Sequence, residues 1–184
     1  MQPLVMNERP PVLWLTGLSG AGKSTLANQL KARFNAFGQM AVVLDGDELR
    51  HGVCRDLGFS ALDRAENIRR AGEVARLFRD TGVWVVVALI SPFAQNRAAV
   101  REMIGEGFVE VFVDTPLAVC ERRDPKGLYA RCRQGDLALL TGISSPYESP
   151  RTPDVHLDGA VGQGVDQHVD QVLDFLRARG DWRH

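Results

Sequence analysis

Eight consecutive residues near the start of the chain have the types and the spacing that hold the phosphates of a nucleotide. Residues 17–24, with the sequence GLSGAGKS, fill every fixed place of the pattern G-x-x-x-x-G-K-[ST]. Glycine lets the backbone curl so that successive N–H groups point inward, which makes an anion-binding nest at the start of the following helix. In such a loop Lys23 reaches the β- and γ-phosphates, and the Ser24 hydroxyl takes one place on a bridging Mg²⁺. The residue types therefore predict a nucleoside triphosphate site.

Two carboxylates and a hydroxyl follow the next apolar runs of the chain. Asp45 and Asp47 flank Gly46, and this pair is suited to ordering Mg²⁺, to accepting a hydroxyl proton or to hydrogen-bonding an acceptor substrate. We assign Asp45 as a possible Mg²⁺ ligand and Asp47 as the residue that orients or deprotonates an acceptor hydroxyl; a plain acidic turn is the alternative. Ser91 either touches a phosphoryl group or satisfies the turn before Pro92, and the residues alone favour the turn.

Basic residues form two groups, one after the acidic turn and one in the later, irregular part of the chain. Arginine forks bind phosphate and sulfate oxygens in a bidentate manner and neutralise the charge on a transferring phosphoryl group. We expect about half of them to face water, because helices carry a charged outer side. The two groups are Arg50, Arg55, Arg64, Arg69 and Arg70, and then Arg122, Arg123, Lys126, Arg131 and Arg133.

The pattern of apolar runs predicts the strands and helices that position these residues. Apolar runs alternate with amphipathic stretches, which is the βαβ rhythm of a parallel sheet with helices on both faces. The carboxyl ends of such strands meet at one crevice, where we expect the chemistry. A helix that begins near Asp63 would be capped by that residue, with Glu66 three places on. We predict an α/β fold with a mostly parallel five-stranded sheet: strands over 12–16, 40–44, 83–90, 108–113 and 154–157, helices over 25–37, 63–79, 94–104 and 165–179, a short helix after residue 116, and a loop from residue 45.

Residues 122–153 are rich in Arg, Gly, Pro and Ser and have little apolar periodicity. A segment of this length is too long for a routine connection in a compact domain, and such segments are often functional lids. We therefore expect one domain over residues 1–184, with an Arg-rich mobile lid over about residues 122–153.

Composition excludes several function classes. The chain has 184 residues, 45% of them hydrophobic, and a formal net charge of −1, so nothing attracts it in general to nucleic acid or to an anionic membrane. Its 3 cysteines form no C-x-x-C pair and its 4 histidines lack the spacing of a helical zinc site. We expect a cytoplasmic protein with a small-molecule partner, no nucleic-acid or membrane partner, and Mg²⁺ carried in with the nucleotide as its ion.

Several stretches, taken together and in order, resemble the adenylyl-sulfate kinase family. The phosphate-binding loop is one of them, and several independent motifs in register are far more specific than that loop alone. The stretches are 17–25, 44–47 (LDGD), 57–60 (LGFS), 63–70 (DRAENIRR), 90–93 (ISPF), 124–129 (DPKGLY) and 141–148 (TGISSPYE), so the resemblance covers about residues 12–150.

The resemblance implies a P-loop kinase fold and ATP-dependent phosphorylation of the 3′-hydroxyl of adenosine 5′-phosphosulfate. It also implies a homodimer and a functional link to ATP sulfurylase. A phosphoserine intermediate is commonly assigned at the position of Ser91, whereas we favour direct in-line transfer. By position, the resemblance implies catalytic roles for Lys23, Asp47 and Ser91; ATP binding by Gly17, Leu18, Ser19, Gly20, Ala21, Gly22, Lys23, Ser24, Thr25, Arg122 and Arg123; and binding of the phosphosulfate nucleotide by Asp47, Arg50, Phe59, Arg64, Asn67, Ile90, Ser91, Lys126 and Leu140.

The chain departs from the family pattern in two places. Leu139 and Leu140 stand where Gly and Phe are usual, so the adenine that stacks on Phe59 would lack an aromatic ring on its other face. Glu48 and Leu49 replace the Asn and β-branched residue that are common after Asp-Gly-Asp. Two alternatives therefore stay open: a kinase for another nucleotide or a small alcohol, and a nucleotide-binding module without turnover.

Overall fold

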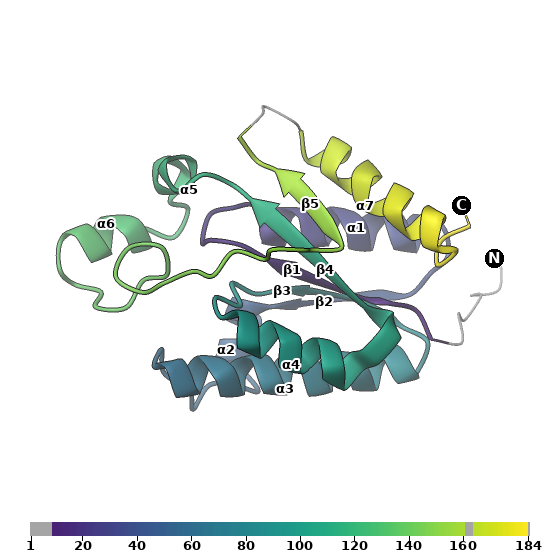
Figure 1. Ribbon diagram of the computed structural model, residues 1–184, viewed down its shortest axis with the longest axis horizontal. Coiled ribbons are helices and arrows are strands. Elements are labelled where there is room, and N and C mark those ends of the chain that lie inside the picture. The colour runs from purple at the N-terminus through teal and green to yellow at the C-terminus, as the bar shows by residue number, and fades with distance from the viewer. Residues whose placement is uncertain (1–8, 161–163, 184) are drawn as a thin grey trace.

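The computed structural model describes residues 9–160 and 164–183, and its centre is one parallel sheet (Figure 1). The described strands pair in the order β2-β3-β1-β4-β5, and every pairing is parallel. This confirms the predicted five-stranded α/β sheet, which is wholly rather than mostly parallel. The strands are β1 (Val12–Thr16), β2 (Ala41–Asp45), β3 (Trp84–Ala88), β4 (Phe108–Asp114) and β5 (Val155–Asp158).

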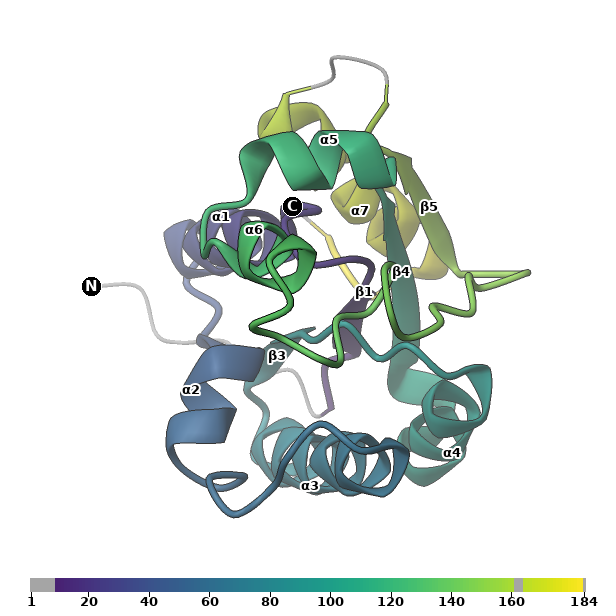
Figure 2. The same cartoon turned by 90° about the vertical axis from the view of Figure 1, so that its left-hand side faces the viewer.

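Helices cover both faces of the sheet, as the alternation of strands and helices predicts. In Figure 1, α1 (Lys23–Ala36) and α7 (Val165–Arg179) lie on one face, and α3 (Ala61–Asp80) and α4 (Ala94–Ile104) lie on the other. The shorter helices are α2 (Gly46–His51), η1 (Gly105–Gly107), α5 (Leu117–Arg123) and α6 (Leu128–Arg133). Figure 2 looks onto the carboxyl ends of the strands, with α2 and α6 in front of the sheet.

The core lies in two layers, one on each face of the sheet. Along β1, Leu13 and Leu15 pack toward α1 and α7, whereas Val12 and Trp14 pack toward α3 and α4, and all are fully buried. A strand buried on both faces must be apolar throughout, which explains the continuous apolar run that precedes the phosphate loop. The rigid strand thus fixes where the loop begins.

Two local predictions were wrong, and side-chain capping explains both. Residue 45 is followed by α2 rather than by a loop, because the Asp45 carboxylate accepts the N–H of Asp47 at 3.0 Å and caps the helix. Helix α3 begins at Ala61, since Ser60 rather than Asp63 is its cap and accepts the Asp63 N–H at 3.1 Å. The segment of residues 122–153, expected to be a lid, contains the end of α5 and the whole of α6.

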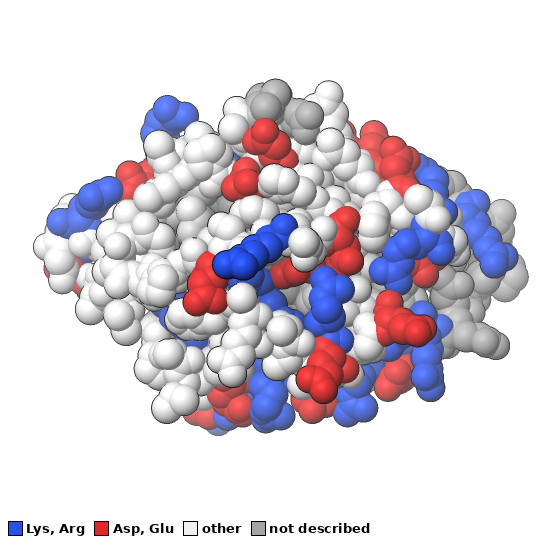
Figure 3. Space-filling model, viewed as in Figure 1, with Lys and Arg blue, Asp and Glu red and all other residues white. Residues whose placement is uncertain are grey.

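The surface carries charges of both signs. On the face shown in Figure 3, acidic and basic side chains alternate and form no extended basic stripe. No helix within residues 9–160 and 164–183 is long and apolar enough to cross a membrane.

Candidate active site

A cavity of about 550 Å³ opens at the carboxyl ends of the strands. Its wall is built from the phosphate loop, the starts of α2 and α3, the turn after β3, and the segment between α5 and β5. Most of the site residues predicted from the sequence line it; Gly17, Leu18, Ala21 and Arg122 do not. The predicted residues that line it are Ser19, Gly20, Gly22, Lys23, Ser24, Thr25, Asp45, Asp47, Arg50, Phe59, Arg64, Asn67, Ile90, Ser91, Arg123, Lys126 and Leu140.

The glycines of the phosphate loop are needed for its shape, including one that does not line the cavity. Gly17 has a φ of +149°, and a Cβ there would lie 2.5 Å from the Val113 carbonyl oxygen of β4. Gly20 has a φ of +75°, and its Cβ would lie 3.0 Å from the Cys120 carbonyl oxygen. The loop therefore lies close against β4 at Gly17 and against α5 at Gly20, so a side chain at Gly17 would clash with the sheet and one at Gly20 would crowd α5 in a strained backbone conformation.

Lys23 lies at the first turn of α1 and is folded back onto the loop. Its Nζ donates to the carbonyl oxygens of Gly17 at 2.9 Å and Leu18 at 2.6 Å, and only 8% of the residue is exposed. Burial disfavours the charged ammonium and lowers the pKa of Lys23 to about 8. A cation held in this way gains a strong partner when an anion enters the cavity.

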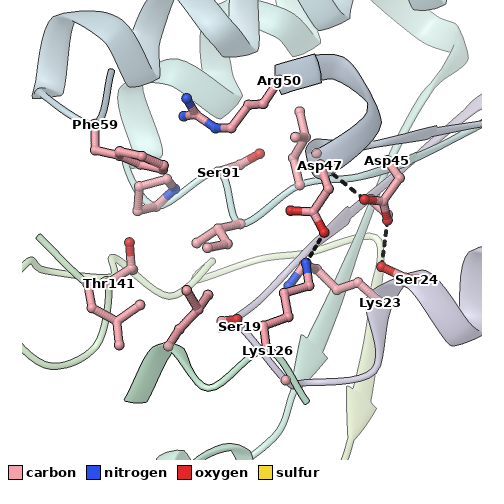
Figure 4. Close-up of a pocket in the computed structure, with 18 of the residues that line it drawn as sticks. Ser19, Lys23, Ser24, Asp45, Asp47, Arg50, Phe59, Ser91, Lys126 and Thr141 are labelled. Carbon is pink, nitrogen blue, oxygen red and sulfur yellow. Dashed lines mark hydrogen bonds and ion pairs between the residues drawn. The ribbon is translucent and has the colours of Figure 1, made fainter. Parts of the chain in front are cut away.

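Ser24 and Asp45 bring a hydroxyl and a carboxylate together beside the loop. The Ser24 hydroxyl donates to Asp45 Oδ2 at 2.5 Å (Figure 4). Oxygen ligands of these two types fit Mg²⁺, which usually takes one or two protein ligands and completes its shell with water and substrate phosphates. Among the described residues there is no cluster of three or more His, Cys, Asp or Glu that could hold a metal by itself. The donor set thus fits a metal that arrives with a nucleotide.

Asp47 and Lys126 face each other from α2 and from the loop after α5. The Lys126 ammonium forms an ion pair with Asp47 Oδ2 (Figure 4). Both side chains are about half exposed, so solvent screens the pair and its contribution to stability is small. Both groups remain available to a ligand.

The other half of the cavity is built around an exposed aromatic ring. Phe59 is 50% exposed, and the Arg50 guanidinium carbon lies 4.2 Å from the centre of its ring, which is a cation–π contact. Arg64 donates to the Phe59 carbonyl at 2.9 Å, to Thr141 Oγ1 at 2.9 Å and to the Leu139 carbonyl at 3.2 Å. Arg64 therefore joins the start of α3 to the segment around residue 140. The sequence predicted only that Arg64 would contact the phosphosulfate nucleotide.

Asn67 carries an unused hydrogen-bond donor at the cavity wall. Only 5% of the residue is exposed, and its buried Nδ2 has no partner within the described structure. A buried donor without a partner is destabilising, and most such groups in native proteins are paired. The amide is thus suited to a ligand acceptor atom.

Ser91 follows β3 in a strained turn. Its φ of +46° lies in the left-handed region, its exposure is 2%, and its Oγ accepts the indole N–H of Trp14 at 2.9 Å. These contacts match the structural role that the residues alone favour. A catalytic role for Ser91 stays a prediction.

Leu139 and Leu140 both line the cavity but differ in burial. Leu139 is 45% exposed, whereas Leu140 is 4% exposed and packs into the core against the α1 face. Of the two, Leu139 is the one with room to meet a ligand, although only Leu140 was predicted as a residue that binds the phosphosulfate nucleotide.

The remaining residues of the wall are ones that sequence reasoning did not assign to a site. Most of them had a signal, because they belong to stretches that resemble the family: Gly46, Ile68, Pro92, Pro125, Leu128 and Thr141. The others, Ala88, Leu89 and Leu137, are apolar and look like ordinary core residues in the sequence.

A parallel sheet with a phosphate loop after its first strand, and with a cavity at the strand ends, defines a P-loop kinase fold. The chain belongs to the adenylylsulphate kinase family, whose model matches residues 9–158.

Individual relatives agree with the family. The chain is 57% identical to an adenylyl-sulfate kinase of Yersinia pestis over 169 residues, which is 91% of this chain and 78% of that protein. It is 54% identical to the bifunctional enzyme NodQ of Rhizobium tropici over 174 residues, which is 94% of this chain but only 27% of NodQ. Its fold matches that of the Mycobacterium tuberculosis APS kinase CysC in complex with AMPPNP and APS, with a TM-score of 0.88, 48% identity, and coverage of 93% of this chain and 99% of that one.

Proposed function

We propose that the protein transfers the γ-phosphoryl group of ATP to the 3′-hydroxyl of adenosine 5′-phosphosulfate, which gives 3′-phosphoadenosine 5′-phosphosulfate and ADP. One observation carries the proposal: a single cavity joins a phosphate-binding loop to a second half with an exposed aromatic ring and an unpaired buried amide. The first half suits a triphosphate and the second suits a nucleoside. The relatives named above support this choice of acceptor.

The donor half would hold the ATP phosphates. The N–H groups of the loop and the Lys23 ammonium would bind the β- and γ-oxygens, and Arg123, whose Nη1 lies 3.4 Å from the Gly20 carbonyl, would add a positive charge. Ser24 and Asp45 would hold Mg²⁺, which neutralises charge on the phosphates. We expect Arg122, which lies outside the cavity wall, to reach ATP only if the neighbouring segment moves.

The acceptor half would hold the phosphosulfate nucleotide. Phe59 offers a ring for adenine to stack on, and the Asn67 amide donates to an acceptor atom of the nucleotide. Arg50 and Lys126 would bind phosphosulfate oxygens. Asp47, once Lys126 turns to the anion, would orient the 3′-hydroxyl and accept its proton.

Direct in-line transfer needs no covalent intermediate. The loop, the metal and an oriented hydroxyl supply what the reaction requires. Ser91, whose hydroxyl oxygen already accepts a bond from Trp14, would then only support the cavity wall. We predict that Ser91→Ala keeps most of kcat in a steady-state assay; complete loss in a folded variant that still binds both substrates would favour a phosphoserine route.

The wider setting of the reaction is also a proposal. We propose one kinase domain over residues 1–184, with residues 122–153 closing over the bound substrates, and a homodimer that acts after ATP sulfurylase. The ion pair from Lys126 to Asp47 supports closure, because it already spans the cavity. A reducing cytoplasm as its location is supported by Cys54, Cys120 and Cys132, which are all free thiols.

The test is release of ADP by purified protein with Mg-ATP and a panel of acceptors. We expect strong stimulation by adenosine 5′-phosphosulfate and little by AMP, other nucleotides or no acceptor. Stimulation by another nucleotide or a small alcohol instead would favour a different acceptor, and the exposed Leu139 in the same cavity wall as Phe59 is the structural reason to test for one. ATP binding without any turnover would favour a binding module.

A further inference from the structure

A buried arginine outside the cavity wall joins three segments that meet behind it. Arg97 of α4 is 4% exposed and does not line the cavity. Its Nε donates to Glu110 Oε1, its Nη1 to the Ser91 carbonyl and its Nη2 to the Glu148 carbonyl, each at 2.7 Å. Because a guanidinium is planar and its donors are fixed relative to one another, these acceptors are held in one geometry.

The Ser91 end of this junction is a strained turn that faces the cavity. Among the described residues other than glycine, Ser91 alone has a φ above +20°. A residue in that conformation keeps it only where its surroundings over-determine it. Here Trp14 holds the Ser91 side chain at 2.9 Å and Arg97 holds its carbonyl, and the neighbours Ile90 and Pro92 line the cavity.

The Glu148 end is the C-terminal attachment of the segment proposed as a lid. The Glu148 N–H donates to the Pro92 carbonyl at 2.8 Å, and its carboxylate accepts the Ala94 N–H at 2.7 Å, at the first residue of α4. Glu148 is thus bonded directly to the turn at residues 90–92 and to the start of α4. Arg97 adds a second link, because its single guanidinium group binds the carbonyl oxygens of both Ser91 and Glu148.

We propose that Arg97 is a positioning residue that makes the turn at residues 90–92 and the lid attachment at Glu148 one rigid unit, and so sets the acceptor half of the cavity. It acts through Ser91 and Glu148 and touches no substrate. The kinetic part of this inference rests on the proposed function; the rigidity part rests on the contacts alone.

The chain offers a matched control on the same helix. Arg101 donates to Asp154 Oδ2 at 2.7 Å and lies 3.5 Å from Glu110 Oε2, but within the described structure it makes no hydrogen bond to Ser91 or Glu148. Removal of Arg97 alone would leave the buried Glu110 carboxylate short of a partner, which is strongly destabilising by itself. The test therefore compares Arg97→Met/Glu110→Met with Glu110→Met alone and with Arg101→Met.

Two readouts separate positioning from a purely structural role. For the double variant we expect KM for adenosine 5′-phosphosulfate to rise about tenfold, as for one lost hydrogen bond to a charged group, with KM for ATP unchanged. Hydrogen exchange at the Glu148 and Ala94 amides should become faster by about the same factor. Neither control variant should change these values, although both should unfold at a lower temperature than the wild type.

Three outcomes would overturn the proposal: unchanged exchange at both amides in a folded double variant, faster exchange with an unchanged acceptor KM, or equal rises in both KM values. Failure of the proposed function gives a different result, because the wild type itself would then show no acceptor-dependent ADP release. In that case the exchange rates still decide whether Arg97 holds the two segments together.

Discussion

The two halves of the cavity are built in different ways. The phosphate half comes almost entirely from one stretch of chain, the loop between β1 and α1, with Asp45 beside it. The acceptor half is assembled from α2, the start of α3, the turn after β3 and the segment between α5 and β5, which are mostly far apart in the sequence. The first half is preformed by backbone, whereas side-chain contacts across the segments, such as Arg64 to Thr141, hold the second half together.

The backbone shapes the phosphate half, and the Lys23 side chain supplies positive charge there. Loss of that charge should therefore lower kcat strongly. We predict that Lys23→Ala lowers kcat about a thousandfold, which is the scale for removing one group that stabilises transition-state charge. Steady-state ADP release with both substrates saturating measures this. Lys31→Ala, on the same helix but outside the cavity wall, is the control and should leave kcat unchanged. Equal kcat values for the two variants would remove Lys23 from the catalytic machinery.

In the acceptor half, removal of the unpaired amide should weaken acceptor binding but stabilise the folded protein. Asn67→Leu keeps the shape of the side chain but removes the buried donor, so KM for the acceptor should rise about tenfold. The free energy of unfolding should not fall, and should rise by about 1 kcal/mol, because a desolvated group without a partner is gone. Denaturant unfolding and acceptor titration measure the two effects. A less stable variant with an unchanged KM would mean that Asn67 serves the core and not a ligand.

The pH dependence of nucleotide binding tests the phosphate half separately. Burial lowers the pKa of Lys23 from 10.5 to about 8 in the free protein, and bound phosphates should raise it again. Binding then takes up a proton above pH 8, so the affinity for ATP should be constant below that pH and fall by up to about tenfold per pH unit above it. Calorimetry in buffers of different ionisation enthalpy measures the proton uptake that accompanies ATP binding. The Lys23→Met variant should bind ATP without this proton uptake.

In the unliganded protein the same lowered pKa makes the free energy of unfolding increase with pH, whereas the affinity for ATP decreases. The unfolded chain, with a Lys23 pKa of 10.5, binds more protons than the folded chain between pH 8 and that value. The contribution of this residue to the free energy of unfolding therefore rises with pH over that window. A thermal midpoint that shows the same pH trend in wild type and Lys23→Met would contradict the assignment.

The smallest expected change in acceptor binding concerns Leu139, one of the two leucines of the acceptor half. Leu139→Phe adds a ring where the side chain is exposed to the cavity, and it should tighten acceptor binding by about 1 kcal/mol if adenine stacks there. Leu140→Phe places the same ring in the core and should lower the free energy of unfolding by about 1–3 kcal/mol. Acceptor titration and denaturant unfolding distinguish them. Tighter binding by the Leu140 variant would reverse the roles of the pair.

The same contrast explains what could be predicted from the sequence. The phosphate loop, β1 and α1 could be predicted because a contiguous motif carries its own geometry, and the strands could be predicted because β1 and β3 are apolar on both faces. The start of α2 was missed because its cap, Asp45, looked like a site residue only. Neither the burial of Leu140 nor the bonds from Arg64 to the segment around residue 140 could be read from the sequence, because both depend on how distant segments pack.

Transfer between the two halves can be followed atom by atom. The most direct test is to supply ATP whose γ-phosphoryl oxygens are ¹⁸O-labelled together with adenosine 5′-phosphosulfate, and to locate the label by ³¹P NMR and mass spectrometry. We predict that the labelled phosphoryl group appears on the 3′-oxygen of the acceptor, in an amount equal to the ADP released. Label that appears only in inorganic phosphate, or at another position of the acceptor, would contradict it.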